Sequence, residues 1–173
     1  MKASIFITGG SKSGKSTFAR ERAESLEGRK VFVATALAID DEMRQRIEAH
    51  KRERGPHWDT VEEPYNLGGV IEQVKGMYDV VVVDCLTIWL TNIMLAWEER
   101  SVEEGIIGLA EGLRQVKGSV DILVVSNEIG MGIVPEGALS RRFRDHAGLL
   151  NQMVAAVCEQ AYLIVSGLPL RLK

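Results

Sequence analysis

The feature that most constrains this chain is a glycine-rich turn close to its start. A short β-prone run, 4–8, leads into Gly9-Gly10-Ser11-Lys12-Ser13-Gly14-Lys15-Ser16, and residues 17–20 have the character of a helix start. A glycine, four residues and then Gly-Lys-Ser is the pattern of a phosphate-binding loop between a strand and a helix. Backbone N–H groups and the helix N-terminus would hold phosphate oxygens, while Lys15 would reach the β- and γ-phosphates and Ser16 would bind Mg²⁺. The sequence therefore predicts binding of a nucleoside triphosphate.

The rest of the chain predicts alternating strands and helices. Strands are expected over 30–35, 80–84 and 120–126, helices over 41–54, 66–75, 86–100, 101–117 and 139–161, a polar connection over 57–64, a loop over 127–137 and a closing hairpin over 162–173. This alternation predicts an α/β fold, P-loop NTPase-like, with a mostly parallel sheet, helices on both faces and a C-terminal hairpin. Ligands of such sheets bind at the carboxyl ends of the strands.

Length and composition predict one nucleotide-binding domain over residues 1–173. The formal net charge of −3 gives no general nucleic-acid or membrane footprint. The longest apolar run, 86–97, is interrupted by polar residues and is too short to span a bilayer. Because the N-terminus leads directly into a strand, we expect no signal peptide and a cytoplasmic location. Cys85 and Cys158 lie in apolar stretches, which favours buried thiols over a disulfide or a metal site.

Asp84 ends an aliphatic strand in the way that the acidic residue of a Walker-B strand does. Its carboxylate could hold Mg²⁺ directly or through water, because this ion prefers oxygen ligands. The alternative is an ordinary cap for the helix that starts at Leu86. We favour the metal site, since a phosphate loop needs such a partner.

His50 lies on the apolar stripe of the predicted helix 41–54, because Met43, Ile47 and His50 follow helical spacing. Nearby cations, among them Lys51 and Arg54, would keep the imidazole neutral and could bind phosphate oxygens. A neutral imidazole is a nucleophile. Composition alone favours the other interpretation, a core histidine beside a solvated basic patch. The other two histidines are weaker candidates, His57 in an exposed loop and His146 in a surface pair with Asp145.

Two further sequence features allow more than one interpretation. The loop 127–137 holds three glycines at the predicted active edge, so its backbone could approach a ligand or move over it, or it could be an ordinary long connection. Arg141, Arg142 and Arg144 could clamp an anionic substrate or form a solvated helix face.

Together these motifs resemble the bifunctional adenosylcobinamide kinase/adenosylcobinamide-phosphate guanylyltransferase family of cobalamin biosynthesis. The resemblance covers nearly the whole chain and rests on Thr8-Gly9-Gly10 with Ser13 to Ser16, Ala34-Thr35, Asp40 to Met43, Arg46-Ile47, His50-Lys51, Pro56, Trp58, Glu62-Glu63-Pro64, Asp84 to Thr87, Trp89-Leu90, Asn92, Asn127-Glu128, Gly130, Gly132 to Pro135, Phe143 to Asp145, Gly148 and Asn151-Gln152. The segments around His50, Asn127 and Phe143 are much more specific than the phosphate loop, which many enzymes share.

The resemblance implies two activities. His50 would attack the α-phosphate of GTP, release pyrophosphate and pass the bound GMP to adenosylcobinamide phosphate, giving adenosylcobinamide-GDP. The same enzyme would first phosphorylate adenosylcobinamide with ATP or GTP held at the phosphate loop. It implies catalytic roles for His50 and Lys15 and a magnesium site at Ser16 and Asp84. Nucleotide binding would involve the phosphate loop Gly9 to Ser16 together with Ala34, Thr35, Lys51, Arg54, Glu62 and Asp84. The resemblance also implies a homotrimer, and the apolar stretch 86–97 is our candidate for part of its interface.

Two other functions compete with this interpretation. A small-molecule kinase would transfer only the γ-phosphoryl group and use His50 structurally. A regulatory GTPase switch ranks low, because the chain lacks the Asn-Lys-x-Asp motif that reads guanine, and Ser126-Asn127-Glu128 is a poor substitute.

Overall fold

The computed structural model describes residues 2–38 and 41–173, without the side chains at positions 42, 43, 46, 47, 49, 50 and 53. In chain order the elements are β1 (Ser4–Gly9), α1 (Lys15–Glu24), β2 (Lys30–Ala34), α2 (Asp41–Arg54), β3 (Trp58–Glu62), α3 (Leu67–Val74), β4 (Val80–Asp84), α4 (Leu86–Ala96), α5 (Glu99–Gln115), β5 (Asp121–Val125), α6 (Ala138–Val157), β6 (Gln160–Val165) and β7 (Leu168–Arg171).

The strands form one sheet in the order β3-β2-β4-β5-β1-β6-β7. All neighbouring strands among the first six are parallel to each other, and β7 pairs with β6 in antiparallel orientation. The predicted α/β class, the mostly parallel sheet and the C-terminal hairpin are therefore confirmed. In this order β5 lies between β1, which leads into the phosphate loop, and β4, which ends at Asp84.

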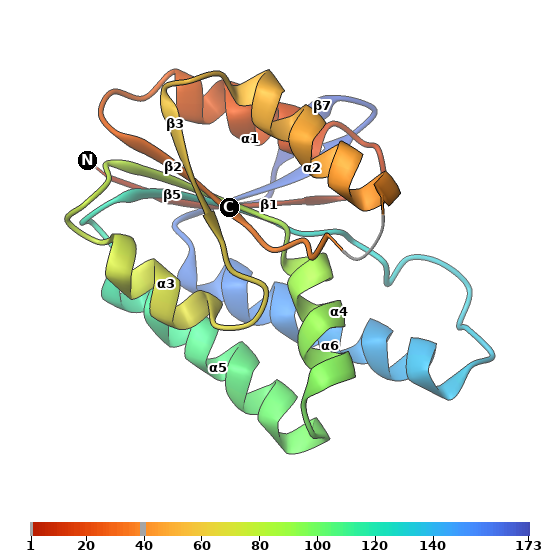
Figure 1. Cartoon of the computed structure of the whole chain (residues 1–173). Coiled ribbons are helices and arrows are strands. Elements are labelled where there is room, and N and C mark those ends of the chain that lie inside the picture. The colour runs from red at the N-terminus through yellow and green to blue at the C-terminus, as the bar shows by residue number, and fades with distance from the viewer. Residues whose placement is uncertain (1, 39–40) are drawn as a thin grey trace.

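Helices cover both faces of the sheet. Figure 1 shows α1 and α2 on one side and α3, α4, α5 and α6 on the other. We call these sides the α1 face and the α6 face. Strand alternation divides the core between them: in β4, Val80 and Val82 pack on the α1 face, whereas Val81 and Val83 pack on the α6 face. By the same alternation Asp84 belongs to the α1 face.

Three segments differ from the sequence-based expectation. The connection predicted over 57–64 contains the edge strand β3. Only Trp58 of this strand is buried, so its other positions can be polar and the sequence lacks the usual apolar strand pattern. The helix predicted over 86–100 ends at Ala96, and α5 starts at Glu99, so the boundary predicted between positions 100 and 101 was wrong. The long last helix ends at Val157 because the chain then pairs with β1 as β6, earlier than expected.

The apolar helix α4 is covered by the chain itself. Leu86, Trp89, Leu90 and Ile93 are all at most 1% exposed and belong to the α6-face core. Most of its large apolar side chains are therefore unavailable for the trimer interface predicted over 86–97. Leu95, at 72% exposed, is the large apolar side chain of α4 that faces away from this core. The trimer itself stays a prediction.

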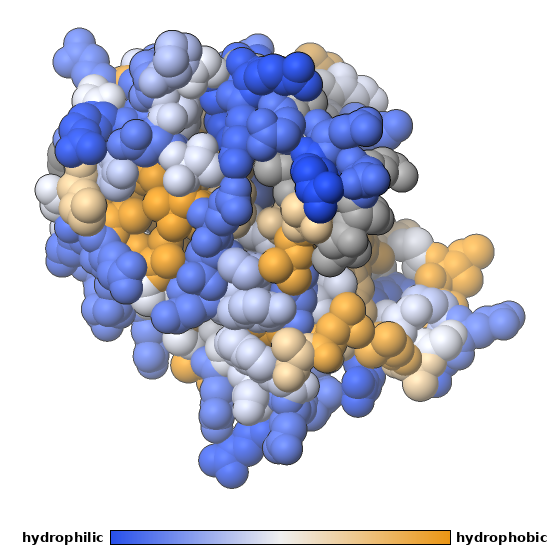
Figure 2. All heavy atoms as spheres, viewed as in Figure 1, coloured by the Kyte–Doolittle hydropathy of each residue, from blue (hydrophilic) through white to orange (hydrophobic). Residues whose placement is uncertain are grey.

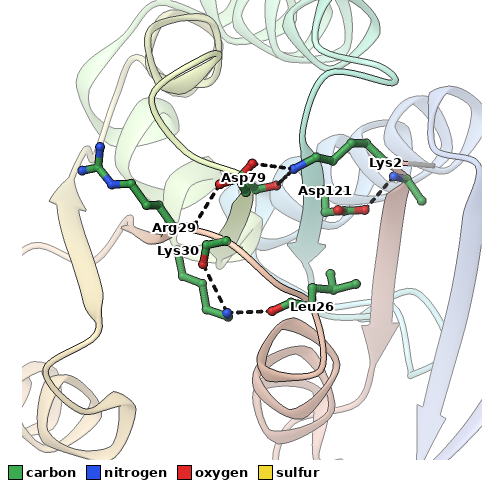
Figure 3. Close-up of polar contacts among 8 residues, drawn as sticks. Lys2, Leu26, Arg29, Lys30, Asp79 and Asp121 are labelled. Atoms are coloured by element: carbon green, nitrogen blue, oxygen red, sulfur yellow. Dashed lines mark hydrogen bonds and ion pairs between the residues drawn. The ribbon is translucent and has the colours of Figure 1, made fainter.

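The amino ends of the strands are held together by charged groups (Figure 3). Asp79, which precedes β4, accepts hydrogen bonds from Lys2 Nζ at 2.9 Å and from the backbone N–H of Arg29 at 3.0 Å. The hydrogen bond from Lys2, followed by that from Arg29, lowers the pKa of the Asp79 carboxyl. Asp121 accepts from the N–H of Ala3 at 2.8 Å. These contacts hold together the amino ends of β1, β4 and β5, at the end of the strands opposite the phosphate loop.

Both cysteines are free and buried, as predicted. Burial raises the pKa of the Cys85 thiol to about 11 and that of Cys158 to about 12. Over residues 2–38 and 41–173, no helix combines the length and the apolar character that crossing a membrane requires.

Candidate active site

The phosphate loop joins β1 to α1 and lies against the C-terminal hairpin. The backbone N–H of Gly167, in the β6–β7 turn, donates to the carbonyl of Ser13 at 2.8 Å. Gly9 has a φ of +151°, and a Cβ there would lie 2.4 Å from the carbonyl oxygen of Ile164. Only glycine fits so close to a neighbouring strand. β6 thus fixes the path of the loop.

The start of α1 is open to an anion. Its N-cap residue, Gly14, provides no side-chain hydrogen bond and has a φ of 101°. Unpaired N–H groups of the first turn and the helix dipole therefore attract negative charge at this end. Ser16 is exposed, whereas Lys15 is 7% exposed and its Nζ donates to the carbonyl of Gly10 at 2.5 Å. Burial lowers the pKa of the Lys15 ammonium, and the nearby Asp84 carboxylate acts in the opposite direction.

A cleft of about 80 Å³ opens beside this loop on the α1 face. Its walls are Ser16, Thr17, Arg20, Phe32, Arg54, Trp58, Val82 and Asp84. The structure therefore brings together the Ser16 hydroxyl and the half-buried Asp84 carboxylate, the two predicted magnesium ligands. Both are hard oxygen donors, which fits Mg²⁺.

Arg54, the last residue of α2, lines the cleft. It is 6% exposed, and its guanidinium carbon lies 3.7 Å from the centroid of the Phe32 ring. This stacking holds a permanent positive charge beside Asp84 and Ser16. His50 stands four residues earlier in α2, at a position on the same helical face as Arg54. The side chain of His50 lies outside the described part of the chain.

The remaining predicted binding residues follow β2 and β3. Ala34 is paired with Asp84 in the sheet. Lys51 forms a 2.7 Å ion pair with the exposed Glu62, and this hydrogen bond raises the pKa of the Lys51 ammonium. The two residues therefore link the end of α2 to the end of β3. Their contact with a nucleotide stays a prediction.

Thr35 is fully buried and acts on the segment that follows Asp84. Its hydroxyl donates to the carbonyl of Cys85 at 2.8 Å and accepts from the Cys85 N–H at 3.0 Å. The amide of Asn92 in α4 donates to the Thr35 carbonyl at 2.8 Å. Any contribution of the Thr35 hydroxyl to nucleotide binding is therefore indirect, through the turn that carries Asp84.

The three arginines of α6 hold loop 127–137 and α5 in place. Arg144 donates to the carbonyl of Gly130 at 2.6 Å, and Arg141 donates to the carbonyls of Pro135 and Glu136. Arg142 pairs with Glu99 at 3.1 Å. The bonds of Arg141 and Arg144 attach loop 127–137 to α6. This loop projects at the right of Figure 1. Its side chains Met131, Ile133 and Val134 are exposed, and Figure 2 shows apolar atoms on this projection.

Two histidines have partners that the sequence does not reveal. His146 is 7% exposed, with Nε2 2.7 Å from Glu99 Oε1, so its predicted surface pairing with Asp145 was wrong. His57 is exposed as predicted and lies 3.0 Å from Glu24. Sequence reasoning also missed Arg20, Phe32 and Trp58 as walls of the cleft. Alternate residues of a strand lie on the same face of the sheet, so Phe32 shares a face with the predicted site residue Ala34. This alternation was the sequence signal that could have identified Phe32.

Comparison with known sequences assigns the family. The family described as cobinamide kinase/cobinamide phosphate guanyltransferase matches residues 5–172. The chain belongs to this family. It is 43% identical over 168 residues to the bifunctional adenosylcobalamin biosynthesis protein CobP of Pseudomonas aeruginosa, covering 96% of this chain and 95% of that protein. It is 36% identical over 183 residues to the protein CobU of Escherichia coli, covering 98% and 99% respectively. The predicted resemblance is confirmed.

Solved structures show the same fold at low identity. The RadB recombinase aligns with a TM-score of 0.57 and 15% identity, covering 94% of this chain and 75% of its own. An ATPase of a type III secretion system aligns with a TM-score of 0.55 and 11% identity, covering 93% of this chain and 50% of its own. These likenesses concern the fold alone.

Proposed function

We propose that this enzyme phosphorylates adenosylcobinamide and then transfers GMP from GTP to adenosylcobinamide phosphate through a guanylylated His50. One observation carries the proposal: the open start of α1, the Ser16 and Asp84 oxygens and the Arg54 end of α2 meet in one cleft. A triphosphate held there would have its β- and γ-phosphates at the loop. The helix that contains His50 ends at the same cleft.

In the kinase step the acceptor is a hydroxyl of adenosylcobinamide. Its oxygen forms a bond to the γ-phosphorus while the bond to the β-phosphate oxygen breaks, and the hydroxyl proton is released. Lys15 and the N–H groups at the start of α1 stabilise the charge that collects on the nucleoside diphosphate. ATP or GTP would serve as donor, because nothing in this step depends on the base.

In the guanylyl step His50 is the nucleophile. A neutral ring nitrogen forms a bond to the α-phosphorus of GTP, and pyrophosphate leaves. An oxygen of adenosylcobinamide phosphate then attacks the same phosphorus and releases the imidazole, giving adenosylcobinamide-GDP. This covalent intermediate divides one difficult displacement into two easier ones. Arg54 would bind phosphate oxygens during both transfers, since its guanidinium is fixed by the Phe32 ring.

Ser16 and Asp84 are the residues that would hold Mg²⁺, and the ion would neutralise phosphate charge. Gly9 to Ser16 would supply the phosphate cradle. Ala34, Thr35, Lys51 and Glu62 would complete the nucleotide site along the ends of β2 and β3. A single domain over 1–173, the homotrimer and a cytoplasmic location remain parts of this proposal.

Labelling with α-labelled GTP and Mg²⁺ tests the mechanism. The wild type should retain acid-labile, base-stable label at His50, and His50→Ala should retain none. An unlabelled wild type, or a fully labelled His50→Ala, contradicts the covalent step. If His50→Ala also phosphorylates adenosylcobinamide at the wild-type rate and the wild type releases no pyrophosphate, the protein is a small-molecule kinase instead.

A further inference from the structure

The segment after β5 continues to pair with the phosphate-loop strand. The N–H of Ser126 donates to the carbonyl of Ile7 at 2.9 Å, and the N–H of Glu128 donates to the carbonyl of Gly9 at 3.0 Å. Donors two residues apart toward one neighbour are the pattern of an extended parallel pairing. Ser126 and Asn127 therefore direct their side chains to opposite faces of the sheet.

Ser126 faces α6. Its hydroxyl donates to Asn151 Oδ1 at 2.7 Å, and Asn151 Nδ2 donates to the carbonyl of Asn127 at 3.1 Å. Ser126 is 2% exposed and Asn151 is 8% exposed. On the other flank, the Thr87 hydroxyl of α4 accepts from the N–H of Asn127 at 2.9 Å. The peptide groups on both sides of Asn127 are thus fixed by buried or half-buried partners.

The Asn127 side chain falls on the α1 face, the face of the cleft. Val125 packs in the α1-face core, and Asn127 is two residues further along the same face. Val125 is paired with Asp84, the predicted magnesium ligand, and Asn127 lies two residues further along, next to Gly9 of the phosphate loop on one side and Thr87 of α4 on the other. The Asn127 carboxamide is half-buried, and it makes no hydrogen bond with any residue that the structure describes.

We propose that Asn127 is a further catalytic residue whose carboxamide NH₂ donates to an oxygen of the γ-phosphate, and that Asn151 is its positioning residue. The inference rests on the proposed function and extends it. Ser16 and Asp84 would hold Mg²⁺, which would neutralise charge on the terminal phosphates, so the γ-phosphate would lie toward the end of β4 and β5. A neutral donor with a fixed backbone stabilises charge there without reorganising during transfer.

Binding measurements separate this role from general nucleotide binding. Dissociation constants of GDP and of a non-hydrolysable β,γ-imido GTP analogue are measured with Mg²⁺ for the wild type, Asn127→Ala and Asn127→Asp. For Asn127→Ala we expect GDP affinity within about twofold of wild type and analogue affinity about 10-fold weaker. Asn127→Asp should weaken the analogue further, because a carboxylate repels the γ-phosphate. Equal changes for both ligands, or none, overturn the proposal.

Catalysis and coupling provide the second readout. Asn127→Ala should lower kcat of the kinase step about 100-fold, the cost of removing one donor to a transition-state oxygen. Asn151→Ala should shift the analogue-to-GDP affinity ratio in the same direction, and the double variant should be no worse than Asn127→Ala alone. If Asn151→Ala lowers only Tm and leaves this ratio unchanged, the positioning role is refuted.

A matched control comes from Asn66, which caps α3 by accepting from the N–H of Gly69 at 3.2 Å. Asn66→Ala should lower Tm and leave the affinity ratio at the wild-type value. A wild type that fails to phosphorylate adenosylcobinamide contradicts the proposed function. It leaves the analogue-to-GDP comparison intact, so the two failures can be told apart.

Discussion

Replacing Thr35 by valine tests whether its hydroxyl holds the turn that carries Asp84. Valine keeps the shape and burial of threonine and removes both hydrogen bonds to Cys85. The buried Cys85 N–H then has no acceptor, which costs about 1–3 kcal/mol. The Cys85 carbonyl keeps the helical bond from Trp89 N–H at 3.2 Å, so the lost donor there costs only about 1 kcal/mol.

We therefore expect Thr35→Val to lower the free energy of unfolding by about 2–4 kcal/mol. For a chain of this length, that lowers Tm by about 5–15 °C. Thr35→Ser is the matched control, because serine keeps both hydrogen bonds and loses one methyl group, worth about 1 kcal/mol. The measurement is urea denaturation of the two variants and the wild type under identical conditions.

The same substitution should act on the metal site. Because Cys85 follows Asp84 directly, a loosened turn displaces the carboxylate, and the Mg²⁺ concentration for half-maximal activity should rise about 10-fold. Thr35→Ser should need the wild-type Mg²⁺ concentration. A Thr35→Val protein as stable as Thr35→Ser, within about 0.5 kcal/mol, with unchanged Mg²⁺ dependence, would show that the reasoning is wrong.

Other substitutions test the nucleotide site and the ion pair at the amino ends of the strands. Lys15→Ala should lower both kinase and guanylyl-transfer rates by about 100-fold or more, whereas His50→Ala should remove only guanylyl transfer, as separate assays of the two products would show. Gly9→Ala should abolish nucleotide binding measured by calorimetry, because its Cβ would lie 2.4 Å from a β6 carbonyl oxygen; wild-type affinity would contradict that clash. Asp79→Asn should lower Tm at pH 7. Since the pKa of Asp79 is lowered by its hydrogen bond from Lys2, the stabilisation is complete above pH ~4 and fades as pH falls through the lowered pKa. The Tm difference from wild type should shrink over that range, and a pH-independent difference would rule out this ion pair as its source.

Local sequence patterns were enough for much of the fold. The phosphate loop, the aliphatic run of β4 and the periodic helices α2 and α6 were predicted because each rests on neighbours within a few residues. The edge strand β3 was missed because it pairs on one side only and keeps polar residues. The start of α5 was misplaced because Glu99 is held by Arg142 and His146, which lie in α6.

The phosphate loop, Asp84 and the family resemblance came from the sequence by itself, since motif spacing and chain order carry that information. Which side chains meet in the cleft was decided by the tertiary structure. Arg54 reaches Phe32 only because α2 packs on the α1 face, and Thr35 meets Cys85 only because β2 lies beside β4. The fixed peptide of Asn127 depends on α4, α6 and β1 at once. Contacts between residues far apart in the chain arise from packing, and no local pattern records them.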